Sequence, residues 1–490
     1  MSHTGYASLI NTIIIKIILH TYLSVIFIYF ILLLVVGRIF TRTTSNDVFF
    51  RAEGKSPWYV VAFGMIGASI SGVTFISVPG MVMSQDMTYL QMCLGFIVGY
   101  FLVAFVLLPI YYRLHLTTIY TYLRERLGPR SYKTGSAFFF LSKMAGAAVR
   151  FYIVCLLLQT TVFDSIAIPF PVTAIMLVLM IWLYTKRGGI KAIVYTDFLQ
   201  TFVMFATLIM ILVSLVAGMD MSVSEAVKAI AESEHSRIFV FDDWTSKQNF
   251  WKQFLSGIFV VIVMTGLDQD MMQKNLTCRN IKDAQKNLCS YSFAFVPANL
   301  ICLSLGVLLL IYSSSHGIPV PERADDLLPG LAATGILGNT VAILFTIGIV
   351  ASAFSSADSA LTALTTTLTI DLFHRPADEA FRKKAHIAVI ILFIVSVMAV
   401  KEAGSSSVIN TIYVLCGYTY GPLLGLFLFS IITPYKVFDR YVPIVCICSP
   451  LICFLIDRIA QLYGYSFGYE LLMLNGLLTF SGCFLLRQKR

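Results

Sequence analysis

The chain has 490 residues, 58% of them hydrophobic and only 12% charged, and its formal net charge is +9 at pH 7. Soluble domains carry about a quarter charged residues, so this composition excludes an ordinary soluble protein. The ten cysteines are scattered and no His lies near them at metal-ligand spacing, which disfavours a disulfide framework and a zinc site.

The N-terminal segment 1–20 is apolar but is interrupted by Lys16 and His20, and no A-x-A cleavage site follows the apolar run that begins at Tyr22. We treat it as an extension of undecided structure and not as a removable signal peptide. Beyond it, apolar runs long enough to cross a bilayer recur along the whole chain, which predicts an all-α integral membrane protein. The thirteen predicted spans are 21–40, 57–83, 89–111, 133–162, 169–186, 190–218, 250–274, 285–313, 336–372, 384–400, 407–432, 438–457 and 466–486.

The positions of Lys and Arg predict how these spans are oriented. Basic residues concentrate in alternate loops, from Arg38 and Arg42 after the first span to the C-terminal residues 487–490, whereas the opposite long loops 219–249 and 314–335 are acidic. Because basic loops stay in the cytoplasm, we expect a multi-pass protein of the cell (inner) membrane with its N-terminus outside and its C-terminus inside. The basic excess is then a topology signal, which disfavours nucleic acid as a partner. We expect a monomer.

The second span, 57–83, is punctuated by glycines, and its polar residues Ser69, Ser71 and Thr74 lie where a helix would be weakest. Glycine destabilises a helix interior, and irregular backbone at membrane depth is tolerated only where it is buried or lines a cavity. Two interpretations stay open. The stretch is either a glycine-rich packing face or a broken helix that offers carbonyls to a cation and side chains to a substrate.

The seventh span, 250–274, repeats this arrangement, with Gly266, Asp268 and Asp270 towards its inner half. Lys274 is assigned to the basic loop that follows. Five spans separate the starts of the second and seventh spans, which is the order expected of an inverted five-helix repeat. The predicted units are an N-terminal extension (1–20), a first helix (21–40), a first five-helix repeat (57–218), a second, inverted repeat (250–432) and two peripheral helices with a short cytoplasmic tail (438–490).

The ninth span, 336–372, carries hydroxyl groups on one face. At about 100° per residue, Ser352, Ser355 and Ser356 fall within one sector of the helix. A lone serine in such a helix packs against a neighbouring helix, but three hydroxyls at i, i+3 and i+4 offer hard oxygen ligands that suit a cation such as Na⁺. Asp358 adds negative potential nearby.

Two further charges lie inside predicted spans, where each is costly. Asp197 lies early in the sixth span, and we interpret it as part of a cation site with the hydroxyl-rich ninth span. Arg150 lies near the middle of the fourth span, on the same face as Lys143. Its guanidinium either forms a structural salt bridge to an Asp of another helix or holds a carboxylate of the substrate.

Five segments resemble, in this order, those of the sodium/solute symporter family, whose members include bacterial proline, galactose and sialic-acid transporters. They are SGVTFISVPG (71–80), GGIKAIVYTDFLQ (188–200), DQDMMQKNLTCRNIKDAQK (268–286), ASAFSSADSALTALTTTLTIDLF (351–373) and YGPLLGLFLFS (420–430). The resemblance covers the first eleven spans. It implies a LeuT-type core of two inverted five-helix repeats with alternating access around a central site.

The resemblance also implies binding residues. The sodium site would be made by the backbone carbonyls of Gly67, Ile70 and Ser352 and the hydroxyls of Ser355 and Ser356. A second sodium ion, held by Asp197, Ser352 and Ser355, is an alternative. The residues implied to bind substrate are Ser69, Ser71, Thr74, Arg150, Asp268 and Gln91.

We therefore expect a sodium-coupled secondary active symporter that imports a small organic solute. The first candidate is an acidic sugar of the sialic-acid kind or another small carboxylate, and a neutral sugar is the alternative. Its partners would be the solute, one or two Na⁺ ions and the lipid bilayer. A transporter-like membrane sensor, which would need a soluble signalling tail, and a passive channel are alternatives of other classes. No nucleophile–base pair is recognisable in the sequence, so we do not expect an enzyme.

Overall fold

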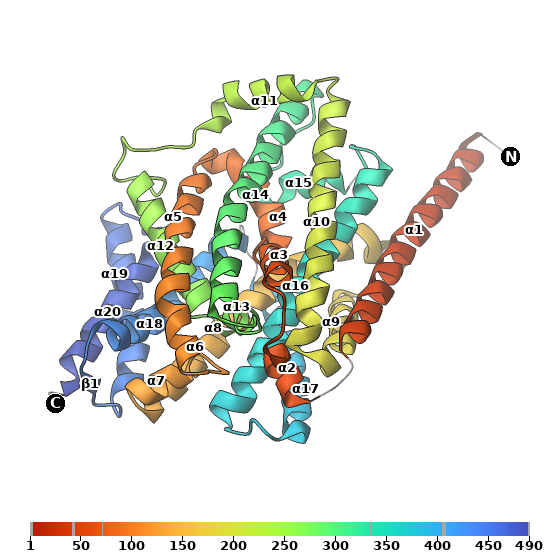
Figure 1. The fold of residues 1–490 in the computed structure, drawn as a ribbon. Coiled ribbons are helices and arrows are strands. Elements are labelled where there is room, and N and C mark those ends of the chain that lie inside the picture. The colour runs from red at the N-terminus through yellow and green to blue at the C-terminus, as the bar shows by residue number, and fades with distance from the viewer. Residues whose placement is uncertain (1–2, 42–44, 71, 334, 404–407, 489–490) are drawn as a thin grey trace.

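Long apolar helices, many of them running side by side, make up nearly all of the structure (Figure 1). The computed structural model describes residues 3–41, 45–70, 72–333, 335–403 and 408–488. A chain in lipid finds no hydrogen-bond partners there for its backbone, so helices, which satisfy their own N–H and C=O groups, are the structure that this composition requires. The helices are α1 (His3–Phe40), α2 (Asn46–Arg51), α3 (Trp58–Ser69), α4 (Gly72–Gln85), α5 (Tyr89–Leu102), α6 (Leu108–Arg113), α7 (Thr121–Arg126), α8 (Pro129–Leu158), α9 (Phe170–Gly188), α10 (Ile190–Gly218), α11 (Val223–Glu232), α12 (Phe250–Val261), α13 (Gln269–Asn275), α14 (Ile281–Ser315), α15 (Leu327–Ala332), α16 (Asn339–Thr366), α17 (Glu379–Ala403), α18 (Val408–Ile432), α19 (Val442–Leu462) and α20 (Leu471–Leu485).

Short irregular turns extend or connect these helices. Tight 3-10 turns occur at Ala52–Gly54, Asp164–Ile166, Glu234–Ser236 and Ala324–Asp326, and wider π turns at Val103–Leu107, Gln159–Phe163, Ile262–Gly266 and Thr367–Leu372. Two strands of two residues each, β1 (Lys436–Val437) and β2 (Arg487–Gln488), pair antiparallel after α18 and α20.

Ten helices of the described chain are long and apolar enough to cross a membrane, and two bent pairs bring the number of candidate spans to twelve. Trp58–Ser69 and Thr74–Gln85 are bent by 50°, and Phe250–Gly266 and Gln269–Asn275 by 70°. The thirteenth predicted span is not confirmed, because α20 has 15 residues. A helix of that length is about 22 Å long, shorter than a hydrocarbon core of about 30 Å.

The two bent pairs occupy equivalent places in the order of elements. The first, α3 with α4, is followed by α5 and α6, α8, α9 and α10, and the second, α12 with α13, is followed by α14, α16, α17 and α18. This order agrees with the expected repeats, whose boundaries at 57–218 and 250–432 stay predictions.

Direct backbone contact joins α5 to α12. A Cβ atom built on Gly95 would lie 2.1 Å from the Phe254 carbonyl oxygen, and one built on Gly257 would lie 2.3 Å from the Met92 carbonyl oxygen. Any larger side chain at either position would push the helices apart, so the two glycines allow this close approach. We call this contact the glycine seam.

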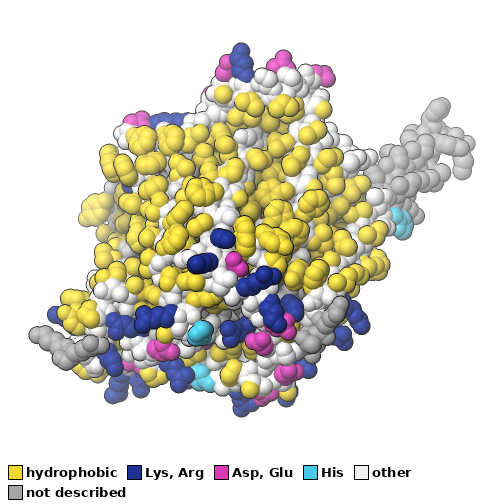
Figure 2. Space-filling view, in the orientation of Figure 1, with side chains coloured by type: hydrophobic (Ala, Val, Ile, Leu, Met, Phe, Trp, Pro, Cys, Tyr) yellow, Lys and Arg dark blue, Asp and Glu magenta, His cyan; other side chains and the backbone are white. Residues whose placement is uncertain are grey.

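The periphery of the bundle carries the features expected of a protein in a bilayer. Residue His3 already belongs to α1, so the predicted N-terminal extension continues into the first helix, which at 38 residues is about 57 Å long. Figure 2 shows a broad band of hydrophobic side chains with Lys and Arg gathered along the lower edge of this face. The surface helix α11 lies at the opposite edge, at the top of Figure 1.

Candidate functional site

The first bent pair is broken where the sequence places its small polar residues. The helix α3 ends at Ser69 because Ile70 leaves the helical conformation, with φ −78° and ψ 62°. The Thr74 hydroxyl donates to the Ser69 carbonyl at 3.3 Å, which restores one hydrogen bond lost at the break. Both Ser69 and Thr74 line a central cavity, so the broken helix is observed; Ser71 lies outside the described residues.

The serine face of α16 lies against this break. The Ser352 hydroxyl donates to the Ile70 carbonyl at 3.3 Å, which places hydroxyl and carbonyl oxygens side by side. The Ser356 hydroxyl oxygen is buried and has no hydrogen-bond partner among the described residues. A buried polar atom without a partner is costly, and hard oxygens of this kind are what a small cation requires. The residues present therefore fit a sodium ion.

The remaining member of the predicted sodium site, Gly67, lies where α3 meets α10. A Cβ atom at this position would come within 1.9 Å of the Thr201 hydroxyl oxygen. The same hydroxyl donates to the Asp197 carbonyl at 2.7 Å. Glycine at 67 therefore holds the broken helix close to the helix that carries Asp197.

Asp197 lies beside the serine cluster, as the sequence predicts, but it already has a cationic partner. Ser355 donates to Asp197 Oδ1 at 2.6 Å, and Lys274 Nζ lies 2.8 Å from Asp197 Oδ2. Both charged side chains are 1% exposed. The assignment of Lys274 to a cytoplasmic loop is wrong. The 70° bend before α13 turns this helix into the bundle, where a lysine must be paired.

A second ion-pair network links α8 to the N-terminus of α13. Lys143 Nζ lies 3.1 Å from Asp268 Oδ2 and 2.7 Å from Asp270 Oδ2. Tyr420 donates to Asp268 Oδ2 at 2.7 Å, and Asp268 Oδ1 accepts from the backbone of Asp270 and Met271, capping α13. Asp268 lines the cavity, yet both of its oxygens are engaged, so it acts first as the anchor of this network.

Arg150 also lines the cavity, on the same helix as Lys143. Within the described part of the chain it forms neither an ion pair nor a side-chain hydrogen bond, and Asp268 and Asp270 pair with Lys143. The sequence left open a structural salt bridge between Arg150 and an Asp of another helix. No such Asp pairs with Arg150 among the described residues. The polar side chains that line the cavity are Ser69, Thr74, Tyr89, Tyr100, Ser142, Lys143, Arg150, Thr265, Asp268, Asp270, Ser355, Ser356 and Tyr420.

Gln91, which the resemblance implies to bind substrate, is not among the residues that line this cavity. Its amide nitrogen donates to the Gln248 carbonyl at 2.9 Å, and its amide oxygen accepts from the Val240 backbone at 3.0 Å. The side chain therefore fastens the loop before α12 onto α5. The spacing along α5 could not reveal this, because the partners lie about 150 residues away in sequence.

The central cavity is also lined by side chains that the sequence does not indicate as binding residues. In the sequence, Lys143 stands out only as a neighbour of Arg150, Asp270 only as a charge near Asp268, and Tyr420 only as part of a segment that resembles the family. The signal for Lys143 was present, because a lysine near the middle of a span requires an acidic partner. Asp358 points elsewhere, since its carboxylate accepts from Tyr184 of α9 at 2.7 Å.

A helical bundle with two broken helices around a polar cavity is the architecture of a secondary active transporter. Residues 49–435 match the sequence model of the Sodium:solute symporter family, and the chain belongs to this family. Sodium is the coupling ion that gives the family its name. The matched range contains both bent pairs, the serine face of α16 and the Asp197–Lys274 ion pair.

Individual relatives agree with this membership. The chain is 25% identical to the sodium/sialic acid symporter SiaT of Proteus mirabilis (strain HI4320) over 437 residues, covering 83% of this chain and 84% of the relative. It is 26% identical to the human sodium/iodide cotransporter over 408 residues, covering 80% of this chain and 62% of that protein.

Among solved structures, a Na⁺-coupled sialic acid symporter in a substrate-bound, outward-open state matches with a TM-score of 0.82 at 20% identity, covering 96% of this chain and 99% of that one. The nucleobase-cation-symport transporter Mhp1 in a closed conformation matches with a TM-score of 0.59 at 14% identity, covering 89% of this chain and 93% of that one. The predicted LeuT-type fold is therefore confirmed.

Proposed function

We propose that this chain is a sodium-coupled symporter that imports a small carboxylate-bearing solute, with an acidic sugar of the sialic-acid kind as the first candidate. The observation that carries the proposal is the unused hydrogen-bonding capacity of Arg150 in the cavity. Asp268 and Asp270 both contact Lys143, whereas the Arg150 guanidinium has no ion pair and no side-chain hydrogen bond among the described residues. A guanidinium in this position suits a substrate carboxylate, which it binds through two parallel hydrogen bonds. The names of the sialic-acid relatives support the same class of substrate.

Sodium and substrate would share the broken helix. The proposed sodium ligands are the carbonyls of Gly67, Ile70 and Ser352 and the hydroxyls of Ser355 and Ser356, which would join α3 to α16. Ser69 and Thr74, on either side of Ile70, line the cavity. An ion that orders the break therefore also orders substrate contacts, which is the differential binding that coupling requires. An inward membrane potential adds about 2.3 kcal/mol per charge per 100 mV.

We propose one sodium ion per cycle and keep the second as the alternative. A second ion at Asp197, Ser352 and Ser355 would compete with Lys274, whose ammonium already lies 2.8 Å from the Asp197 carboxylate. One positive charge is enough to neutralise this buried carboxylate. The proposed arrangement in the cell membrane has the end with α11 outside and the basic edge of Figure 2 inside, with two inverted repeats in a monomer.

Transport by purified protein in liposomes tests the proposal. We expect an inward sodium gradient, and not a potassium gradient, to drive uptake of radiolabelled sialic acid. Replacing Arg150 with Gln should weaken its binding by about 2–5 kcal/mol, the usual effect of truncating a buried charged pair. Arg150→Lys should restore only part of the lost binding free energy, because a lysine ammonium cannot form the two parallel hydrogen bonds that a guanidinium forms with a carboxylate.

The control is Lys384→Gln, an exposed position outside the cavity. Transport of a neutral sugar that survives Arg150→Gln unchanged, with no uptake of any carboxylate, would refute the carboxylate assignment in favour of the neutral-sugar alternative. Sodium-independent uptake would refute coupling itself.

A further inference from the structure

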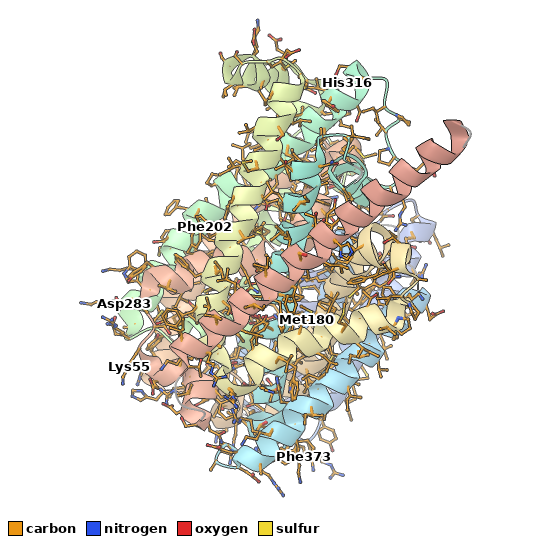
Figure 3. The ribbon with its side chains drawn as sticks, turned by 90° about the vertical axis from the view of Figure 1, so that its right-hand side faces the viewer. Lys55, Met180, Phe202, Asp283, His316 and Phe373 are labelled. Carbon is orange, nitrogen blue, oxygen red and sulfur yellow. The ribbon has the colours of Figure 1, made fainter. Side chains whose placement is uncertain are left out.

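A second, basic pocket lies away from the central cavity, between the C-terminal end of α9 and the N-terminal end of α17. It has a volume of about 470 Å³. Figure 3 looks at this side of the molecule, where α9, marked by Met180, and α17, which begins beyond Phe373, lie next to each other. The lining residues are Phe49, Trp182, Lys186, Arg187, Arg382, Lys383, His386 and Ile387.

The charge of this pocket is of one sign. Four of the eight lining residues are Lys or Arg, and none of the described lining residues is acidic. Lys186 and Arg382 lie over the aromatic rings of Trp182 and Phe49, at 4.3 and 4.4 Å from the ring centres, which fixes their positions. Four cations held around one pocket favour an anion.

His386 contributes a polar contact of a different kind. Thr365 donates its hydroxyl proton to the Leu361 carbonyl at 2.6 Å and lies 2.8 Å from His386 Nδ1. Nδ1 is then the donor in that pair, which in a neutral imidazole leaves Nε2 as an acceptor. This nitrogen is buried and has no hydrogen-bond partner among the described residues. The pocket therefore offers cations for a phosphate and an acceptor for a hydroxyl group.

Two exposed apolar stripes continue from the cations towards the middle of the bilayer. On α17, Lys383 is followed at steps of four residues by Ile387, Ile391 and Val395, and all three apolar side chains are exposed. On α9, Arg187 is preceded at the same step by the exposed Leu183 and Leu179. Residues four apart share a helix face, so each stripe lies in line with a cation. A surface with cations at one end and two apolar stripes leading away from them is complementary to a lipid that has a charged headgroup and two acyl chains.

We propose that this pocket binds the headgroup of an anionic glycerophospholipid, with the phosphate between Arg187 and Lys383, a headgroup hydroxyl at His386 and the acyl chains along the two stripes. Basic pockets between membrane helices on the cytoplasmic side recognise anionic lipids. The lipid would hold α9 and α17 together at the membrane surface. This site is separate from the sodium and substrate residues, so it can be tested independently of transport.

Thermal unfolding of the full-length protein in detergent, with added phosphatidylglycerol or phosphatidylcholine, tests the proposal. We expect phosphatidylglycerol to raise the unfolding temperature and phosphatidylcholine to have no effect. The double variant Arg187→Gln, Lys383→Gln should need about thirtyfold more phosphatidylglycerol for half-maximal stabilisation, because each basic residue near an anionic lipid adds a factor of about five. A matched double variant, Lys384→Gln with Arg440→Gln, changes exposed cations outside the pocket and should behave like the wild type.

A third addition, soluble glycerol phosphate, separates a lipid from a free phosphate ester. Stabilisation by glycerol phosphate equal to that by phosphatidylglycerol would overturn the lipid assignment. Equal stabilisation by phosphatidylcholine, or equal responses of the two double variants, would overturn the pocket. If the first double variant does not fold, native mass spectrometry of the single variant Lys383→Gln, counting bound phosphatidylglycerol, gives the same comparison against Lys384→Gln.

Discussion

Replacing Lys274 with Met removes the only positive charge that the described structure places within ion-pair distance of Asp197. At 2.8 Å and an effective dielectric constant of about 20, the attraction between the two charges is about 6 kcal/mol. Part of this offsets the cost of burying both groups, so the net loss from breaking the pair should be about 3–5 kcal/mol. The double variant Lys274→Met, Asp197→Asn should regain most of that loss, because neither residue is then charged.

Equilibrium unfolding in mixed detergent micelles measures these free energies. Potassium buffer without sodium keeps any ion binding at the serine cluster out of the measurement. We expect a coupling energy of at least about 2 kcal/mol from the double-mutant cycle. Lys384→Met, an exposed lysine, is the control and should change the free energy of unfolding by less than about 0.5 kcal/mol. A loss below about 1 kcal/mol for Lys274→Met, or a double variant no more stable than the single one, would refute the buried ion pair.

Three other variants probe separate parts of the molecule. Ser356→Ala should raise the sodium concentration for half-maximal uptake about tenfold or more, which is equivalent to about 1.4 kcal/mol. Its thermal stability in potassium should stay unchanged. An unaltered sodium dependence would contradict Ser356 as a sodium ligand. Gly257→Val should lower the free energy of unfolding by several kcal/mol, because overpacking at the glycine seam separates α5 from α12. An unfolding midpoint equal to that of the wild type would show that the two helices accommodate a larger side chain there. Gln91→Leu should leave substrate affinity unchanged but speed proteolysis within residues 240–248, because the Gln91 side chain fastens this loop to α5. Weaker substrate binding with an undigested loop would instead place Gln91 in the substrate site.

Local signals in the sequence predicted the helices and located the weak point of the second span, but they left open whether it is a glycine-rich packing face or a broken helix. Glycines and small polar residues around Ser69 weaken the helix where the structure breaks it, and the spacing of Ser352, Ser355 and Ser356 placed their hydroxyls on one face. These features depend on neighbouring residues, whose geometry a helical repeat fixes. Most span limits were recoverable for the same reason, but α1 begins at His3 and not at residue 21, and α20 is too short to be counted as a span by length.

Contacts between distant segments were not recoverable in the same way. The partner of Lys274 lies 77 residues earlier in sequence, and the direction of the bend before α13 decides whether this lysine faces water or the bundle. Lys143 pairs with Asp268, which is 125 residues away. Gln91 is polar and lies on a membrane helix, a pattern equally compatible with substrate binding and with anchoring a loop. Only the packing of the helices separates these alternatives.

The glycine seam constrains how the transporter can move. At Gly95 and Gly257 the two helices touch through their main chains, so no side chain lies there whose rotation could absorb a sliding displacement. We therefore expect α5 and α12 to travel as one mechanical unit whenever the access route changes sides. Spectroscopic labels attached to the exposed residues Val98 and Leu255 should then keep a constant separation through the whole cycle.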